Sequence, residues 1–64
     1  MLFRVKITKC VDIVVEASDL NEVMDFADNL LRECTNAEKV FIHSIDKGFN
    51  ELIDKGVIYR KLVK

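Results

Sequence analysis

The sequence predicts an α+β fold in which one main helix packs on one face of a four-stranded, mostly antiparallel sheet. Two segments, residues 3–8 and 11–17, alternate apolar and polar residues with the period of two that is typical of half-buried strands. A third segment, residues 19–34, repeats apolar residues at the i, i+3, i+4, i+7 spacing of a helical stripe. The chain has no proline and only two glycines, so few residues are available for loops.

Length and composition favour a small globular protein. The 64 residues form a single domain, 1–64, of which half are hydrophobic and a third are charged. This mixture argues against disorder, which needs low hydrophobicity and a large net charge. The net charge of −1 also removes the general electrostatic attraction by which strongly basic proteins bind nucleic acids.

The first two strands should form a hairpin whose turn lies near Thr8, Lys9 and Cys10. No glycine or asparagine is available there for a positive φ, so a longer, bulged strand is the alternative. The residues predicted to face the helix are Phe3, Val5, Ile7, Ile13 and Val15.

The main helix begins at Ser18 or Asp19, either of which can cap it, and Glu22 fits the reciprocal position three residues after Asp19. Thr35 and Asn36 provide a stop. The apolar stripe consists of Leu20, Val23, Met24, Ala27, Leu30, Leu31 and Cys34.

The second half of the chain predicts two strands and a short helix. The third strand runs from Val40 to Ile45, and a turn follows at residues 46–48. The short helix, Phe49–Lys55, ends at Gly56 as a left-handed cap, and Val57 to Val63 form the last strand.

The element order is therefore ββαβ(α)β. A right-handed helical crossover returns the third strand parallel to the second and antiparallel beside the first. The predicted strand order is 2-1-3-4, and the sheet face opposite the helix is left open.

The two cysteines, Cys10 and Cys34, do not resemble a disulfide framework or a C-x-x-C pair. Cys34 lies on the apolar stripe, where a small buried hydrophobe is expected. No apolar run exceeds three residues, which is too short for a membrane span or a signal-peptide core. We therefore expect a cytoplasmic protein with both thiols reduced.

The sequence does not predict an enzyme. It contains one histidine, His43, in the middle of a strand. Lys9 is the one neighbour in the sequence that could activate Cys10, and Cys34 lies on the apolar stripe. Three scattered Cys and His residues do not supply the closely spaced ligands of a zinc site, and no glycine-rich phosphate loop is present. We expect no catalytic residues, no metal and no cofactor.

Four acidic residues recur every three positions along the main helix. One interpretation is an ordinary solvated helix face. The other is an acidic stripe that contacts a protein partner with a basic surface. These residues are Asp19, Glu22, Asp25 and Asp28.

The open sheet face is the second candidate surface. Its aromatic and basic side chains would form a platform for single-stranded nucleic acid, or a face buried by a second copy of the chain. An exposed edge at strand two or four would allow a partner to add a strand. The residues proposed for this face are Arg4, Lys6, Phe41, His43 and Tyr59.

Residues 3–8, residues 11–19 and Glu22 together resemble the start of the DpnD/PcfM-like small proteins, which enter a helix after two such strands. The resemblance implies a phage or mobile-element setting. The compact, glycine-poor chain also resembles phage inhibitors of bacterial defence, including anti-CRISPR proteins.

The leading hypothesis is a non-enzymatic, self-associating protein-binding module, such as a phage or mobile-element inhibitor that contacts a basic partner. The alternative is a nucleic-acid-binding module that uses the open sheet face. No membrane partner is expected.

Overall fold

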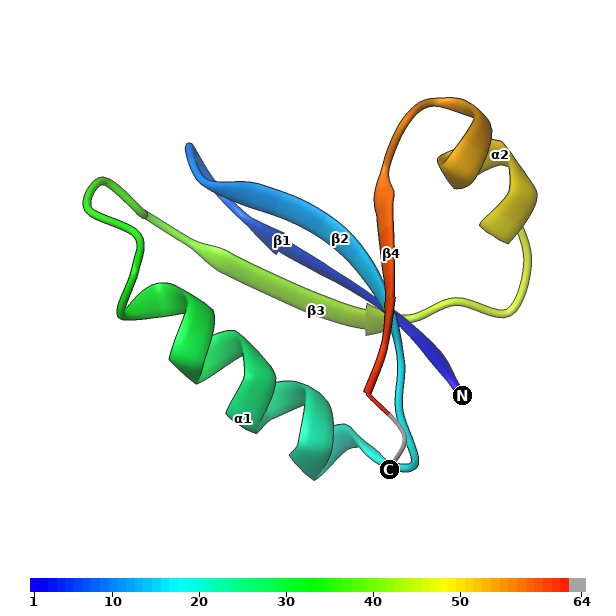
Figure 1. Ribbon diagram of the computed structural model, residues 1–64, viewed down its shortest axis with the longest axis horizontal. Coiled ribbons are helices and arrows are strands. Elements are labelled where there is room, and N and C mark those ends of the chain that lie inside the picture. Colours follow the sequence, from blue (N-terminus) through cyan, green and yellow to red (C-terminus); the bar gives the residue numbers. More distant parts are fainter. Residues whose placement is uncertain (63–64) are drawn as a thin grey trace.

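The computed structural model describes residues 1–62 and has the predicted element order, with two helices and a four-stranded sheet (Figure 1). The predicted last strand includes Val63, which lies outside the described residues. The elements are β1 (Leu2–Ile7), β2 (Val11–Glu16), α1 (Leu20–Leu31), β3 (Val40–Ser44), α2 (Phe49–Asp54) and β4 (Ile58–Lys61).

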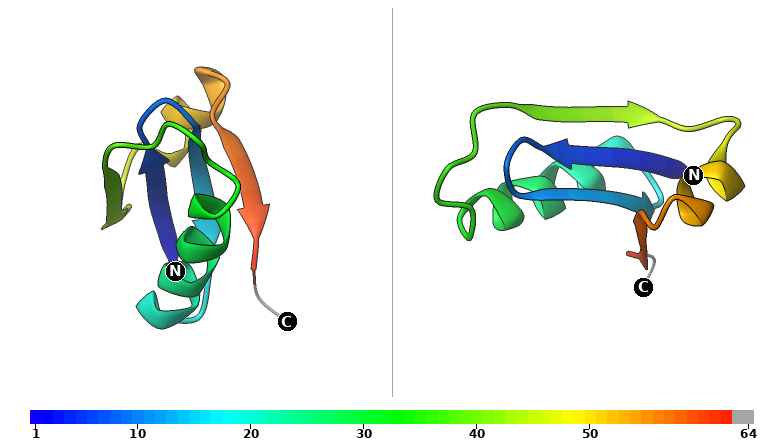
Figure 2. Two further views of the ribbon diagram at one scale, coloured as in Figure 1. Left: turned by 90° about the vertical axis from the view of Figure 1, so that its left-hand side faces the viewer. Right: turned by 90° about the horizontal axis from the view of Figure 1, so that it is seen from above.

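The strand order is 3-1-2-4, so the predicted order 2-1-3-4 is wrong for the last strand. β1 pairs antiparallel with both β2 and β3, as expected, but β4 pairs parallel with β2. The left-hand view of Figure 2 shows β3 and β4 at opposite edges of this mixed sheet. A short hairpin is the simplest connection to an antiparallel neighbour, but the chain between β3 and β4 contains α2 and leads to the other edge of the sheet, where β4 pairs parallel with β2.

The core between α1 and the sheet contains the side chains that the alternation assigned to the helix side. From α1 it includes Val23 and Ala27, while Phe26, Leu30 and Leu31 pack partly against it. Its buried members are Phe3, Val5, Ile7, Ile13, Val15, Ala17, Val23 and Ala27.

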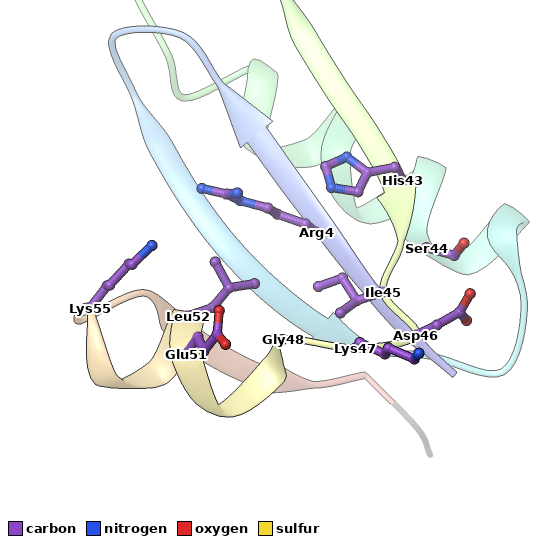
Figure 3. A pocket seen from close by; sticks show the side chains of 10 residues that line it. All are labelled: Arg4, His43, Ser44, Ile45, Asp46, Lys47, Gly48, Glu51, Leu52 and Lys55. Carbon is purple, nitrogen blue, oxygen red and sulfur yellow. The ribbon is translucent and has the colours of Figure 1, made fainter.

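α2 lies on the opposite side of the sheet from α1, so the prediction of one covering helix and one open face is wrong. Val14 points away from the α1 core, yet its side chain is fully buried. On the same face, Phe49 of α2 packs edge-on against Tyr59, with ring centroids 5.4 Å apart. In Figure 3, Leu52 points from α2 toward the sheet. On this face of the sheet, only the area that α2 does not reach is therefore uncovered.

The ends of the elements follow local rules. Asp19 is the N-cap of α1, and its carboxylate accepts a hydrogen bond from the Glu22 amide at 2.9 Å. The helix ends at Leu31, three residues before the predicted end. Lys9 takes a φ of 60° in the β1–β2 turn, which is the positive φ that the turn lacked a glycine to supply. Gly56 has a φ of 89°, as expected of a left-handed cap.

Cys10 and Cys34 form a disulfide, which corrects the prediction of two reduced thiols. The turn after β1 and the turn after α1 lie at the same end of the molecule, so residues 24 positions apart meet. Cys34 is half-buried rather than a free apolar side chain of the core. The cytoplasmic prediction was based on the short apolar runs and expected both thiols to be reduced, and the disulfide contradicts that expectation.

No helix among the described residues has the length and apolar character needed to cross a membrane.

Candidate functional site

Strand β3 forms one edge of the sheet, and its outer side is unpaired within residues 1–62. Hydrogen bonds join the Thr8 amide to the Lys39 carbonyl and the Ile45 amide to the Leu2 carbonyl. Since antiparallel pairs alternate, Phe41 and His43 direct their backbone groups to β1. The amides and carbonyls that point outward are those of Val40, Ile42 and Ser44.

Apolar side chains lie on both faces of this edge. Val40 is 37% exposed on the α1 side of the sheet, and Phe41 is 47% exposed on the α2 side. Ile42 lies on the same face as Val40 and is half-buried against the core. An edge strand with β-branched and aromatic residues in these positions offers both backbone groups and apolar contact to another strand.

The flank of α1 beside β3 extends the apolar surface. The Arg60 guanidinium lies 5.4 Å above the Phe26 ring, which places Phe26 on the β4 side of the helix. At about 100° per residue, Met24 and Leu20 fall on the other side of the buried stripe, toward β3. They are 49% and 50% exposed. We call Leu20, Met24, Val40, Phe41 and Ile42 the β3 edge surface.

The residues proposed for the open sheet face do share one face. Lys6 is directly opposite Phe41, and Arg4 is directly opposite His43, in the β1–β3 pairing. The charge of Arg4, however, is compensated. Its guanidinium donates two hydrogen bonds to the Asp12 carboxylate, at 2.9 and 2.6 Å.

This ion pair changes the acid–base properties of both groups. The hydrogen bonds from Arg4 hold the pKa of the Asp12 carboxyl below its ordinary value, and nearby Lys6 and His43 act in the same direction. The pKa of Arg4 is raised by the same hydrogen bonds. Lys6 is therefore the base that this part of the face presents without a partner within the described chain.

Tyr59 is on the same face but lies two strands away from Arg4 and Lys6, on β4. Its hydroxyl donates a 2.8 Å hydrogen bond to the Glu16 carboxylate, which raises the pKa of the phenol. Its ring also contacts Phe49 of α2. The structure therefore does not gather Tyr59 with the other four residues.

The predicted acidic stripe separates into residues with different roles. Asp19 caps α1, and Glu22 is half-buried with one buried carboxylate oxygen. Asp25 and Asp28 are exposed and form no ion pair with any described residue. Asp19 is exposed as well, so Asp25 and Asp28 are the exposed acidic residues of the stripe that have no capping role.

A hollow of about 270 Å³ lies between the end of β3 and α2 (Figure 3). Arg4 and His43 border it on the sheet, and Glu51, Leu52 and Lys55 border it on α2. Its walls mix both charges with apolar groups. Across residues 1–62, no three His, Cys, Asp or Glu side chains gather as metal ligands.

The sequence did not predict β3 as an edge. Strand two is internal, so the expectation of an exposed edge there is wrong, whereas strand four is at an edge as expected. The apolar and extended pattern of Val40 to Ile45 was visible in the sequence. β3 is at the edge because β4 pairs with β2 and not with β3. No local sequence pattern predicts which strand β4 pairs with.

Comparisons with family models, with curated proteins and with solved structures found no match to this chain. The resemblance of its first half to the DpnD/PcfM-like proteins therefore stays a prediction.

Proposed function

We propose that this chain is a protein-binding module that adds a strand of a protein partner to the β3 edge. The observation that carries the proposal is the outward row of backbone groups at Val40, Ile42 and Ser44, flanked by exposed apolar side chains. Main-chain hydrogen bonds would give affinity, and the apolar side chains would select alternate residues of the added strand.

The contrast between the two sheet edges supports this choice. Soluble proteins usually protect an edge strand with charged side chains, proline or a bulge. β4 carries two adjacent basic residues, Arg60 and Lys61. β3, with the sequence VFIHS, has no proline and no Asp, Glu, Lys or Arg. An unprotected edge on a soluble domain is the kind of edge that a partner covers.

The partner is still a protein, but its principal contact is β3 and not the acidic stripe. Asp25 and Asp28 are exposed on α1, so they would favour a basic partner surface only where the partner extends around α1. An inhibitor of a bacterial defence system remains the function implied by the second resemblance, that of the compact chain to phage inhibitors.

Selection from a random peptide library against the intact, oxidised protein tests the proposal. We expect bound peptides to alternate β-branched or aromatic residues with polar ones, as an added strand requires. Val40→Lys should abolish this binding. Ile58→Lys, which makes the same change on the exposed β4 edge, is the matched control and should retain it. Selected peptides that bind both variants equally would contradict the proposal.

Nucleic-acid binding by the sheet face is the second candidate function, and the pairing of Lys6 with Phe41 favours it. An exposed aromatic ring beside a lysine can stack a base and neutralise its phosphate. Fluorescence anisotropy with single-stranded oligonucleotides should then show salt-dependent binding that Lys6→Glu removes. If no oligonucleotide binds at low salt, this candidate is excluded.

A further inference from the structure

We propose that the partner strand at the β3 edge is β3 of a second copy of this chain, paired antiparallel about a two-fold axis at Phe41. The inference rests on the proposed function, since it names the occupant of the same edge. The result would be one continuous eight-stranded sheet made from two four-stranded sheets.

Hydrogen-bond direction restricts how two β3 edges can meet. Residues whose backbone groups point outward must face one another, so Val40, Ile42 and Ser44 can pair only among themselves. A symmetric pair centred on the strand then has its axis at Phe41, at Ile42 or at His43. These three registers differ in the charges that they bring together.

Two of the three registers bring like charges together just past the end of β3, which ends at Ser44. An axis at Ile42 brings Glu38 toward Asp46 of the second copy. An axis at His43 brings Lys39 toward Lys47. Like charges directly opposite each other destabilise a strand pair, so both arrangements are disfavoured.

The remaining register, with the axis at Phe41, opposes no like formal charges over residues 35–47, the span that includes Asp46 and Lys47. Glu38 meets Ser44 of the second copy, and Lys39 meets His43. This register is therefore the one that the charges of the strand permit.

The same register also matches apolar residues with apolar residues. The two Phe41 rings meet across the axis as a non-hydrogen-bonded pair, where opposite side chains are closest. Val40 of each copy faces Ile42 of the other on the α1 side. The exposed part of the β3 edge surface is thus self-complementary.

α1 contributes two exposed apolar side chains to this interface. Leu20 and Met24 lie on the flank toward β3, so the same flanks of the two helices approach each other across the axis. Asp25 lies on the side of α1 opposite the buried Val23 and Ala27 and stays in solvent, whereas Asp28 continues the ridge of Leu20 and Met24 and is exposed at the border of this interface. A chain this small gains stability from such association because one small core supplies little.

Sedimentation of the oxidised protein over a wide concentration range tests self-association. We expect a species of twice the 7.4 kDa monomer mass. Val40→Lys should weaken the dimer by about tenfold or more, because the symmetric contact is lost twice. Ile58→Lys should leave it unchanged. A dimer that resists Val40→Lys but dissociates with Ile58→Lys would overturn the assignment to β3.

Cysteine cross-linking tests the register. Phe41→Cys should form a covalent dimer, because a non-hydrogen-bonded pair brings the two Cβ atoms within disulfide range. His43→Cys, on the same face of the same strand, should not cross-link. Efficient linking through His43→Cys instead would overturn the register.

The outcomes separate this inference from the proposed function. The wild-type protein could stay monomeric while β3 still binds selected peptides in a Val40-dependent manner. That result would refute pairing with a second copy and would still support a protein-binding function at β3. A monomer that also binds no peptide would refute both.

Discussion

The guanidinium of Arg4 on β1 and the carboxylate of Asp12 on β2 form a two-pronged ion pair, with Nε–Oδ1 and Nη2–Oδ2 distances of 2.9 and 2.6 Å. The two residues are diagonal neighbours on the α2 face of the sheet, since Lys6 is directly opposite Asp12. The pair occupies the centre of the face that the sequence offered for nucleic acid. It leaves Lys6, beside Phe41, as the base available there.

The ion pair predicts a pH-dependent contribution to stability. Because the folded-state pKa of Asp12 is lowered, the contribution is complete above the ordinary carboxyl pKa of 3.8 and is lost as the pH falls through the lower folded-state value. Both side chains are about a third exposed, so we expect about 1 kcal/mol or less.

Denaturant unfolding of wild type and Asp12→Asn over the acidic range measures this contribution. The difference between the two proteins should shrink as the pH falls below 3.8. A difference that does not change with pH would contradict the role given to the ion pair.

Val14 tests whether α2 covers its face of the sheet. Its side chain is fully buried although it points away from the α1 core. Truncation to alanine should therefore lower the free energy of unfolding by about 2 kcal/mol. Ile58→Ala, at an exposed position on β4, should change it much less. Equal effects of the two substitutions would mean that the Val14 face is open, as the sequence alone predicted.

The Cys10–Cys34 disulfide should stabilise the fold chiefly by restricting the unfolded chain. A cross-link between residues 24 positions apart contributes about 3 kcal/mol in the loop-entropy description. We expect Cys10→Ser, Cys34→Ser and reduction of the wild type to lower the free energy of unfolding by similar amounts. If a reducing agent leaves the denaturation midpoint of the wild type unchanged, the disulfide has no such role.

Local patterns were sufficient to predict the elements. The alternation of Phe3, Val5 and Ile7 identified the core side of β1, and the spacing of Val23 and Ala27 identified the buried side of α1. The same alternation assigned Arg4, Lys6, Phe41 and His43 to one face, as the structure has them.

Relations between distant elements were not predictable in the same way. Val14 appears in the sequence as an apolar residue on a polar strand face, and only the position of α2 explains its burial. Cys10 and Cys34 meet because the end of α1 lies beside the hairpin turn. β3 becomes an edge because β4 pairs with β2. The burial of Val14, the disulfide and the edge position of β3 each depend on how distant elements pack together. The residues adjacent to them in the sequence do not specify these features.

Residue-resolved amide hydrogen exchange at Ile42 tests the central claim most directly, because this amide points outward from β3 and is unpaired in the single chain. We predict that it exchanges fast in dilute protein and becomes protected as the concentration rises, while Phe41 and His43 are protected throughout. Fast exchange at Ile42 at every concentration, in a solution where the protein is demonstrably dimeric, would contradict pairing through β3.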